Sequence, residues 1–321
     1  MINIYTHVAP DADAFGSALG LSEILNRGDP DDESTSTVWV RKEDWENRPA
    51  SIRALASKNA ALAFFEDGDP APEGVNWAVD CGDLGRVSCP ASVREKGFKE
   101  SFDHHCNEKF ADVEYGGPRF PAAAAVVAQW VRIRGLGQTP ESATALFAGL
   151  YGDTCGFTVN TGSHLTFATA AALVGGCADT DLVIEAATRQ TLPRARLFAK
   201  VVDSIESHTL GGDEKFLLTC VTKEDFEKVG ATKADYAGVP SQVLRIGSNT
   251  VLAVCLCQDF DTPTTWRVAF RTKGWSKVKA KDLAQMFGGN GHPDAAGGVV
   301  EGATREQALQ AVYSGVMGAW R

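Results

Sequence analysis

Short apolar runs recur along the first half of the chain, and polar turns and helical stretches separate them. The apolar runs predict strands at residues 2–6, 37–40, 60–65, 75–79 and 98–102. A helical periodicity predicts helices at residues 14–25, 50–57, 121–134 and 142–151. Strands that alternate with helices are typical of a parallel sheet. We therefore expect an α/β domain with a parallel sheet and helices on both of its faces.

The pattern changes near residue 188. Two more predicted helices, at 168–176 and 181–187, complete the first domain, and Thr188–Pro193 has the polar, proline-containing composition of a linker. Beyond it, helices are predicted at 196–207 and 223–229, and strands at 216–221 and 251–256. These patterns divide the chain into residues 1–187, a linker at 188–195 and a smaller α/β domain at 196–321.

Side chains that can bind metal follow three of the predicted strands. His7 follows the first strand, Asp80 the fourth, and the triplet Asp103–His105 the fifth. Because the carboxyl ends of parallel strands meet at one edge of a sheet, we expect these residues to converge. The triplet alone would equally suit a solvated loop, but three strands that end in this way favour a functional site.

Three further carboxylates extend this candidate site. Asp11 and Asp13 share the loop after His7, and one imidazole with two carboxylates suits an ion such as Mn²⁺. The alternative is that Asp13 caps the helix that follows. Asp153 ends the helix at 142–151 among small and apolar residues, where an ionised carboxylate needs a counter-charge that a metal would supply. The alternative for Asp153 is a cap on the next helix.

The second domain carries two stretches that suit a phosphate. Residues 267–281 hold six cations and no acidic residue, and Trp266 and Trp275 lie beside them. Cations interleaved with aromatic rings favour a phosphate and a stacked base, although a solvated basic hairpin is equally consistent. Gly288–Gly298 follows, dense enough in glycine to bring backbone N–H groups close to an anion, with His292 as a donor. Together the two stretches predict a phosphate-binding loop.

Composition narrows the class of protein. The 321 residues are 44% hydrophobic, and no apolar run approaches the ~18 residues of a membrane span. Without a recognisable signal segment, we expect a cytoplasmic, non-membrane protein whose eight cysteines are reduced. Cys255 and Cys257 suit a buried strand, His164 suits a helix start, and His208 suits an exposed position.

The charge distribution argues against long nucleic acid as a partner. The net charge is −10, but residues 1–185 carry 14 Lys+Arg against 27 Asp+Glu, whereas residues 186–321 carry 17 against 14. Many phosphate contacts would require a strongly basic surface. An acidic half and a mildly basic half instead suit cations bound in one domain and an anionic ligand bound by the other.

Five motifs in order resemble the DHH phosphoesterase superfamily with its DHH-associated C-terminal domain, especially the bacterial nanoRNase/pAp-phosphatase type. They are His7-x-x-Pro10-Asp11-x-Asp13-x-x-Gly16-Ser17, Val79-Asp80, Asp103-His104-His105, Gly152-Asp153-Thr154-x-x-Phe157 and Gly288-Gly-x-Gly-His292-x-x-Ala-Ala-Gly297. Phe270-Arg271 resembles an arginine motif upstream of the last. The chain departs from the pattern at Asn290, which replaces a usual glycine, and at Pro121–Ala125, where relatives often begin a helix with Ser or Thr.

The resemblance implies two Mn²⁺ ions, for which Mg²⁺ or Co²⁺ could substitute. One would be held by His7, Asp11 and Asp80, and the other by Asp13, Asp80, His104 and Asp153, with Asp80 bridging the pair. The residues implied in catalysis are His105, which would face the phosphate, together with Asp103 and Asp80. The residues implied in binding the distal part of the substrate, across a cleft between the domains, are Arg271, Gly289, Gly291 and His292.

The expected activity is hydrolysis of short oligonucleotides, dinucleotides or pAp-like nucleotides to 5′-mononucleotides. Two alternatives stay open, namely an inorganic pyrophosphatase-like hydrolase and a catalytically inactive nucleotide sensor. The glycine-histidine motif argues against the first, and the complete ligand set argues against the second. The resemblance also allows a homodimer.

Overall fold

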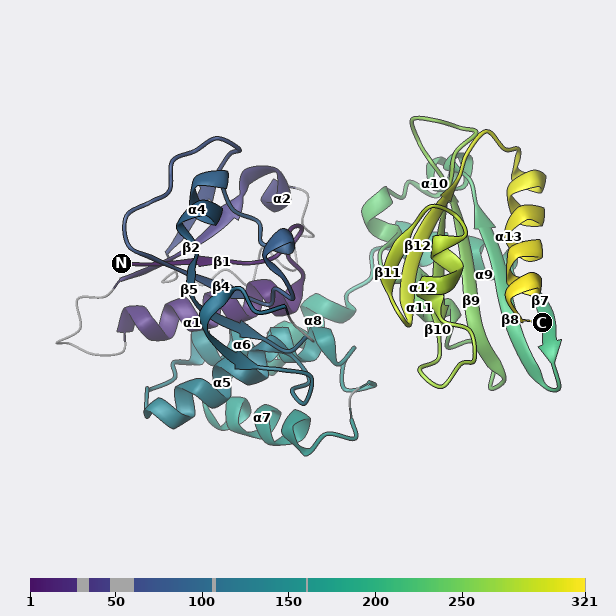
Figure 1. The fold of residues 1–321 in the computed structure, drawn as a ribbon. Helices are drawn as coiled ribbons and strands as arrows, with labels where there is room; N and C mark the ends of the chain where they lie inside the picture. Colours follow the sequence, from purple (N-terminus) through teal and green to yellow (C-terminus); the bar gives the residue numbers. More distant parts are fainter. Residues whose placement is uncertain (28–34, 47–60, 106–107, 160, 321) are drawn as a thin grey trace. The chain divides into compact units, whose positions relative to one another are not determined.

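The computed structural model describes residues 1–27, 35–46, 61–105, 108–159 and 161–320. They form two compact units, Met1–Arg189 and Gln190–Arg321, which are described separately (Figure 1). The helix predicted at 50–57 lies outside the described residues.

The first unit is built on a six-stranded sheet in which every neighbouring pair is parallel. The spatial order is β3-β2-β1-β4-β5-β6, so the order of strands reverses between β1 and β4. The strands are β1 (Ile2–Tyr5), β2 (Ser36–Arg41), β3 (Leu62–Phe65), β4 (Val75–Val79), β5 (Phe98–Asp103) and β6 (Ala111–Gly116). The predicted α/β class is confirmed, and its five predicted strands are present. The sixth, β6, was not predicted, because its sequence ADVEYG is mostly exposed at the sheet edge.

Alternating side chains of the strands enter two different cores. Ile4 and Phe102 face helices α1 (Ala12–Arg27), α5 (Ala123–Arg134) and α6 (Pro140–Asp153) on one side of the sheet. Tyr5 and Phe98 face the other side, where Val93 of the short helix α4 packs. Helices therefore lie on both faces. The remaining helices of this unit are α2 (Lys42–Glu46), the 3-10 helix η1 (Leu84–Arg86), α7 (His164–Gly175) and α8 (Thr180–Thr188), with α4 spanning Ala91–Lys96.

Helices α1 and α6 approach each other closely at glycine. A Cβ on Gly16 would lie 2.3 Å from the backbone oxygen of Ala145, so only glycine fits there. This approach brings the start of α1, which carries Asp11 and Asp13, beside the end of α6, which carries Asp153.

The second unit begins with α9 (Leu192–Asp203), four residues before its expected start at 196. The Thr191 side chain accepts a hydrogen bond from the Arg194 backbone N–H, and Pro193 occupies the first turn. Proline is favoured in a first helical turn, so Pro193 marks a helix start here and not a linker. The helix predicted at 196–207 ends earlier, at Asp203.

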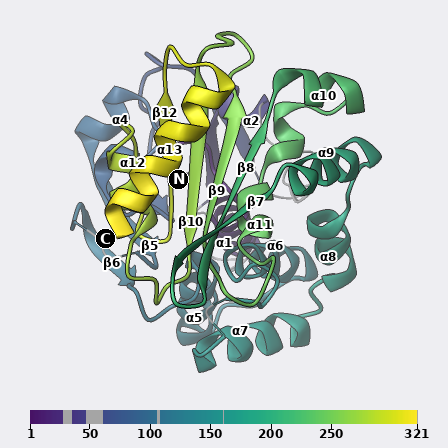
Figure 2. The same ribbon diagram turned by 90° about the vertical axis from the view of Figure 1, so that its right-hand side faces the viewer.

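A mixed six-stranded sheet forms the second unit, in the order β11-β12-β10-β9-β8-β7. Only β8 and β9 are parallel neighbours. Helices α9, α10 and α11 cover one face, and α12 and α13 cover the other (Figure 2). The elements are β7 (Glu206–Gly211), β8 (Glu214–Val221), α10 (Lys223–Val229), η2 (Lys233–Tyr236), α11 (Val239–Val243), β9 (Thr250–Gln258), β10 (Trp266–Thr272), α12 (Ala280–Gln285), β11 (Asn290–His292), β12 (Ala295–Val300) and α13 (Arg305–Trp320).

The basic and glycine-rich stretches are more ordered than the sequence suggested. Trp266 begins an interior strand, is 2% exposed and donates to the Ala303 carbonyl, so it cannot stack on a base, whereas Trp275 is 69% exposed. Gly288–Gly298 is not an open loop but contains the β11–β12 hairpin. A Cβ on Gly289 would lie 1.9 Å from the Gly297 oxygen, so the hairpin itself requires this glycine.

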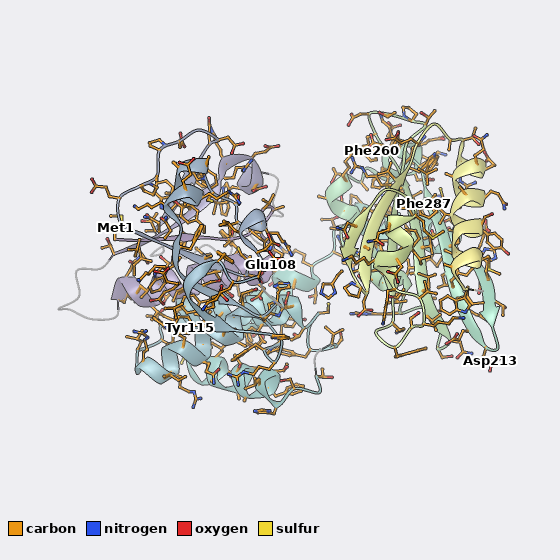
Figure 3. All side chains as sticks on the ribbon, viewed as in Figure 1. Met1, Glu108, Tyr115, Asp213, Phe260 and Phe287 are labelled. Atoms are coloured by element: carbon orange, nitrogen blue, oxygen red, sulfur yellow. The ribbon has the colours of Figure 1, made fainter. Side chains whose placement is uncertain are left out.

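Aromatic packing supports the face of the second sheet that α12 and α13 cover. Phe287, which Figure 3 labels, belongs to this packing. Its ring stacks on that of Phe270, with ring centroids 5.9 Å apart. His208, expected to be exposed, is half-buried between the rings of Phe216 and Tyr313, each 4.9 Å from its own. Within the part of the chain that the structure describes, no helix has both the length and the apolar composition to cross a bilayer.

Candidate metal centre

The candidate centre begins where β1 ends. His7 Nδ1 lies 2.8 Å from the Val8 carbonyl oxygen, so Nδ1 carries a proton and donates it to that oxygen. The Nε2 atom is then the one that can bind a metal ion. His7 Nε2 lies 3.5 Å from Asp80 Oδ2 and 3.8 Å from Asp11 Oδ1. Since β1 and β4 flank the reversal in strand order, His7 and Asp80 meet at the point where open α/β sheets bind ligands.

The two carboxylates at the start of α1 have different structural roles. Asp11 Oδ1 accepts hydrogen bonds from the backbone N–H groups of Asp13 and Ala14, so Asp11 caps its own helix. Asp13 is fully buried and accepts from the N–H groups of Ala123 and Ala124, at 2.6 and 2.9 Å. The cap on α1 that was the alternative role for Asp13 is made by Asp11, and Asp13 caps α5.

This contact accounts for the alanine-rich start of α5. Its N-cap residue is Ala122, which has no side chain that can accept a hydrogen bond. Asp13 supplies the acceptor from another helix, and Ser17 Oγ holds the Asp13 carboxylate at 3.0 Å. The negative charge of the Asp13 carboxylate also lies at the N-terminus of α5, where the helix dipole favours an anion.

Asp80 follows β4 in a left-handed backbone conformation. Its φ is 59°, which costs free energy in a residue other than glycine and is common at functional sites. The Asp80 N–H donates to the Phe102 carbonyl at 2.8 Å, which ties the end of β4 to β5. Its Oδ1 is buried and has no hydrogen-bond partner among the described residues. A buried carboxylate oxygen in that state requires a cation or a proton.

The triplet after β5 completes the group. His104 Nε2 lies 3.0 Å from Asp153 Oδ2 and 3.5 Å from Asp80 Oδ1. His105 Nδ1 lies 2.8 Å from Asp103 Oδ1 and 3.6 Å from Asp80 Oδ1. The structure thus brings together all the predicted ligand positions of the first domain, and Asp153 does not serve as the cap considered for it, because Ser163 precedes the next helix.

Among the residues that the structure describes, ligand atoms within 4.8 Å of one another form three overlapping sets. They are His7, Asp11 and Asp80; Asp13, His104 and Asp153; and Asp80, Asp103, His104 and His105. Asp80 and His104 each belong to two sets, so ions bound at neighbouring positions would share ligands. The mixture of imidazole and carboxylate suits a divalent transition-metal ion.

The charges of the group favour a bound cation. Burial, followed by repulsion from Asp80 and Asp153, raises the pKa of Asp13 well above its usual range. Burial also raises the pKa of Asp80. Burial alone would lower the pKa of His7, but bonds to Asp11 and Asp80 outweigh it and raise that pKa to about 10. Protons and metal ions would relieve the same crowding of negative charge, so these residues fit a metal site.

In the second unit, Arg271 and His292 lie in one row of the sheet. Each is paired directly with Ala295, from opposite sides of β12, so their side chains emerge on the same face. Arg271 Nε donates to Ser241 Oγ at 3.2 Å, and Nη1 donates to the Phe270 carbonyl at 2.8 Å. Burial lowers the pKa of Arg271, and among the described residues no carboxylate forms an ion pair with it.

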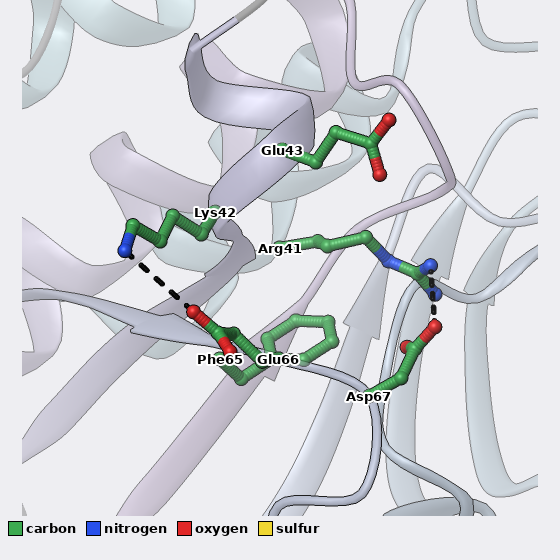
Figure 4. Close-up of a pocket in the computed structure, with 6 residues that line it drawn as sticks. All are labelled: Arg41, Lys42, Glu43, Phe65, Glu66 and Asp67. Atoms are coloured by element: carbon green, nitrogen blue, oxygen red, sulfur yellow. Dashed lines mark hydrogen bonds and ion pairs between the residues drawn. The ribbon is translucent and has the colours of Figure 1, made fainter.

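A pocket in the first unit holds cations that, unlike Arg271, form ion pairs with carboxylates. It lies at the ends of β2 and β3, and its two cations each have a carboxylate partner (Figure 4). Arg41 Nη1 lies 3.1 Å from Asp67 Oδ2, and Lys42 Nζ lies 3.6 Å from Glu66 Oε1. These cations are neutralised within the protein, in contrast to Arg271.

Two contributors to these sites were missed from sequence. The role of Asp13 as a cap on α5 depends on a contact between residues 110 positions apart, which no local pattern records. Ser241 lies on a five-residue helix whose sequence, VPSQV, carries no signal of contact with Arg271.

Comparison with known proteins agrees with this geometry. Residues 1–150 match the family described as the DHH family, N-terminal domain. The chain is 28% identical to the bifunctional oligoribonuclease and PAP phosphatase NrnA of Thermus thermophilus, over 98% of this chain and 89% of the relative. It is 26% identical to the probable bifunctional oligoribonuclease and PAP phosphatase NrnA of Streptococcus mutans, over 92% and 88%. Residues 1–150 therefore resemble the N-terminal domain of the DHH family.

A solved structure shares the fold. The crystal structure of an exopolyphosphatase-related protein from Bacteroides fragilis matches with a TM-score of 0.81. The match covers 99% of this chain and 91% of that protein at 23% identity.

Proposed function

We propose that this protein is a metal-dependent phosphoesterase that hydrolyses short oligonucleotides and small nucleotides to 5′-mononucleotides. The observation that carries the proposal is the buried cluster around Asp80, in which neighbouring ligand sets share Asp80 and His104. Its relatives named as oligoribonuclease and PAP phosphatase support the choice of substrate class.

The cluster would hold two Mn²⁺ ions. His7, Asp11 and Asp80 are the proposed ligands of one, and Asp13, Asp80, His104 and Asp153 those of the other. When bound, such a pair polarises the phosphate, lowers the pKa of water and offsets charge on the leaving oxygen. Asp80 would lie between the ions and reduce their mutual repulsion.

His105 would act on the phosphate itself, and Asp103 would support it. The 2.8 Å contact from Asp103 Oδ1 to His105 Nδ1 fixes the proton on that nitrogen and orients the ring. His105 is partly exposed, so its Nε2 is available to a substrate oxygen. In this proposal Asp103 orients His105, and His105 contacts the reacting phosphate.

Arg271 and His292 would bind the distal part of the substrate. A desolvated guanidinium without an internal counter-ion favours an anionic ligand, such as the phosphate of a nucleotide. Gly289 and Gly291 lie in the same hairpin and would let the ligand approach its backbone closely, while their own N–H groups donate to the Ala284 carbonyl oxygen and to Asn290 Oδ1. Preferred substrates are dinucleotides, very short oligonucleotides and pAp-like bisphosphates.

The decisive experiment is incubation of the purified protein with Mn²⁺ and a 5′-phosphorylated dinucleotide, followed by chromatography of the products. Accumulation of 5′-mononucleotide that chelation abolishes is the expected result. Binding without turnover would identify a nucleotide sensor, and turnover of pyrophosphate alone would identify a pyrophosphatase.

A further inference from the structure

Ser241 is the side chain that holds the Nε end of the Arg271 guanidinium. We propose that Ser241 is a positioning residue, which orients the Arg271 guanidinium to bind an anionic group of a nucleotide without neutralising its charge. This inference rests on the proposed function, in which Arg271 contacts the substrate.

Two contacts fix the plane of the guanidinium. Nε donates to Ser241 Oγ at 3.2 Å, and Nη1 donates to the Phe270 carbonyl oxygen at 2.8 Å. No hydrogen bond from Nη2 to any described residue is found. These bonds use two of the five N–H donors, and the remaining N–H groups of Nη1 and Nη2 are left for a phosphate or carboxylate oxygen.

The short helix that carries Ser241 is anchored firmly. Val239, Pro240 and Val243 of α11 are buried, which leaves Ser241 directed toward β10. The turn before α11 is held by Arg194 of α9, whose guanidinium donates to the carbonyls of Asp235 and Ala237. Ser241 is therefore placed by the packing of its own domain and needs no ligand to reach Arg271.

The surroundings of Arg271 preserve its positive charge. The groups that interact electrostatically with it are Cys255 and Tyr236, and burial raises the pKa of both, so both are neutral near pH 7. Ser241 is neutral as well. A carboxylate at this position could orient the guanidinium equally well, but it would cancel the charge that attracts the ligand.

This distinction between orientation and charge defines the test. Steady-state kinetics with a 5′-phosphorylated dinucleotide in Mn²⁺, and calorimetric binding of 5′-AMP, would be measured for Ser241→Ala, Ser241→Thr, Ser241→Asp and Arg271→Ala. Ser241→Ala should raise KM and the Kd for 5′-AMP by about threefold to tenfold with kcat kept. Ser241→Thr should restore both, because it retains the hydroxyl, whereas Ser241→Asp should not.

The double variant Ser241→Ala/Arg271→Ala separates positioning from a structural effect. In the Arg271→Ala background, loss of Ser241 should have no further effect on KM or Kd, because the group that it positions is gone. Ser248→Ala is the matched control, since its hydroxyl bonds to Asn249 and it should resemble wild type.

Each contrary outcome has a separate meaning. Equal losses from Ser241→Ala with and without Arg271, or full binding by Ser241→Asp, would overturn the positioning role. If Arg271→Ala left binding unchanged, the assignment of Arg271 in the proposed function would be wrong, and this inference with it. If wild type bound 5′-AMP but did not hydrolyse the dinucleotide, the proposed activity would be wrong. The Kd values of the Ser241 variants for 5′-AMP would still test the positioning role of Ser241.

Discussion

Asp80 combines a left-handed backbone, near-complete burial and an oxygen without a hydrogen-bond partner among the described residues. Each of these features costs free energy in the unliganded protein. All three are accounted for if the carboxylate lies between two cations. Substitution of Asp80 is therefore the most direct test of the proposed metal site.

We expect Asp80→Ala to be the most damaging change of a single ligand. Loss of the shared carboxylate removes a contact from both ions and leaves their repulsion uncompensated, so phosphoesterase activity should fall to background. The measurements are dinucleotide turnover and metal content of the folded variant. Retention of both metals and of substantial turnover would show that Asp80 does not bridge.

His164→Ala is the control for this experiment. His164 is exposed at the first position of α7 and belongs to no ligand set among the described residues. Its replacement should leave turnover near that of wild type. A severe chemical defect in the folded variant would mean that the site extends further than proposed.

Arg271→Ala should weaken substrate binding more than it slows the chemical step. Arg271 belongs to the second unit and the ligand cluster to the first, so we assign it to binding. The expected pattern is a KM raised by at least about tenfold with kcat largely kept. An unchanged KM with a collapsed kcat would instead assign Arg271 to stabilisation of the transition state.

Between elements, the contact of α1 with α6 determines the geometry of the site. Gly16→Ala should destabilise the first unit by about 1–3 kcal/mol, because the added methyl would lie 2.3 Å from the Ala145 oxygen. It should also reduce turnover, since the same contact places Asp13 and Asp153. Thermal unfolding and turnover measure the two effects.

The matched control is Gly137→Ala, where a Cβ would have no neighbour within 4 Å. The thermal unfolding midpoint and the turnover of this variant should match those of wild type. If Gly16→Ala behaved in the same way, the close approach of the two helices would not be what holds the ligands in place.

The sequence predicted elements best where burial is one-sided or complete. Ile2–Tyr5 and Val75–Val79 are mostly apolar and mostly buried because both sheet faces are covered, and the candidate ligands follow them directly in the sequence. Prediction was poorer where contacts between distant parts of the chain determine which side chains are buried. Trp266 resembled an exposed stacking residue, yet the pairing of β10 places it in the core, and strand β6 has too few buried side chains to be recognised.

Glycine was the least predictable residue in the second unit. A dense run of glycine equally suits an open anion-binding loop and a tightly packed hairpin. Here the close approach of Gly289 to Gly297 explains the glycine by packing, and the Gly289 N–H donates to the Ala284 carbonyl oxygen.

At the scale of the whole molecule, we expect charge to limit the length of the substrate. The net charge of −10 repels a long polyanion, and the acid-free basic stretch spans only residues 267–281. Phosphate contacts should therefore saturate after very few nucleotides. We expect a higher kcat/KM for a dinucleotide or trinucleotide than for a long single strand.

The measurement is a comparison of end-labelled oligomers of increasing length in Mn²⁺ at fixed salt. The rate should fall with length, with 5′-mononucleotides as products. A rate that stayed level or rose with length would indicate a processive exonuclease.

The division of the chain at residue 189 places the whole ligand cluster in one unit and Arg271 with Ser241 in the other. Substitutions that reshape the second sheet leave the cluster's own contacts untouched. Substrate preference can therefore drift over evolutionary time while the hydrolytic chemistry is inherited unchanged. Relatives with the same ligands but different residues around α11 and β10 are where we expect such divergence in substrate.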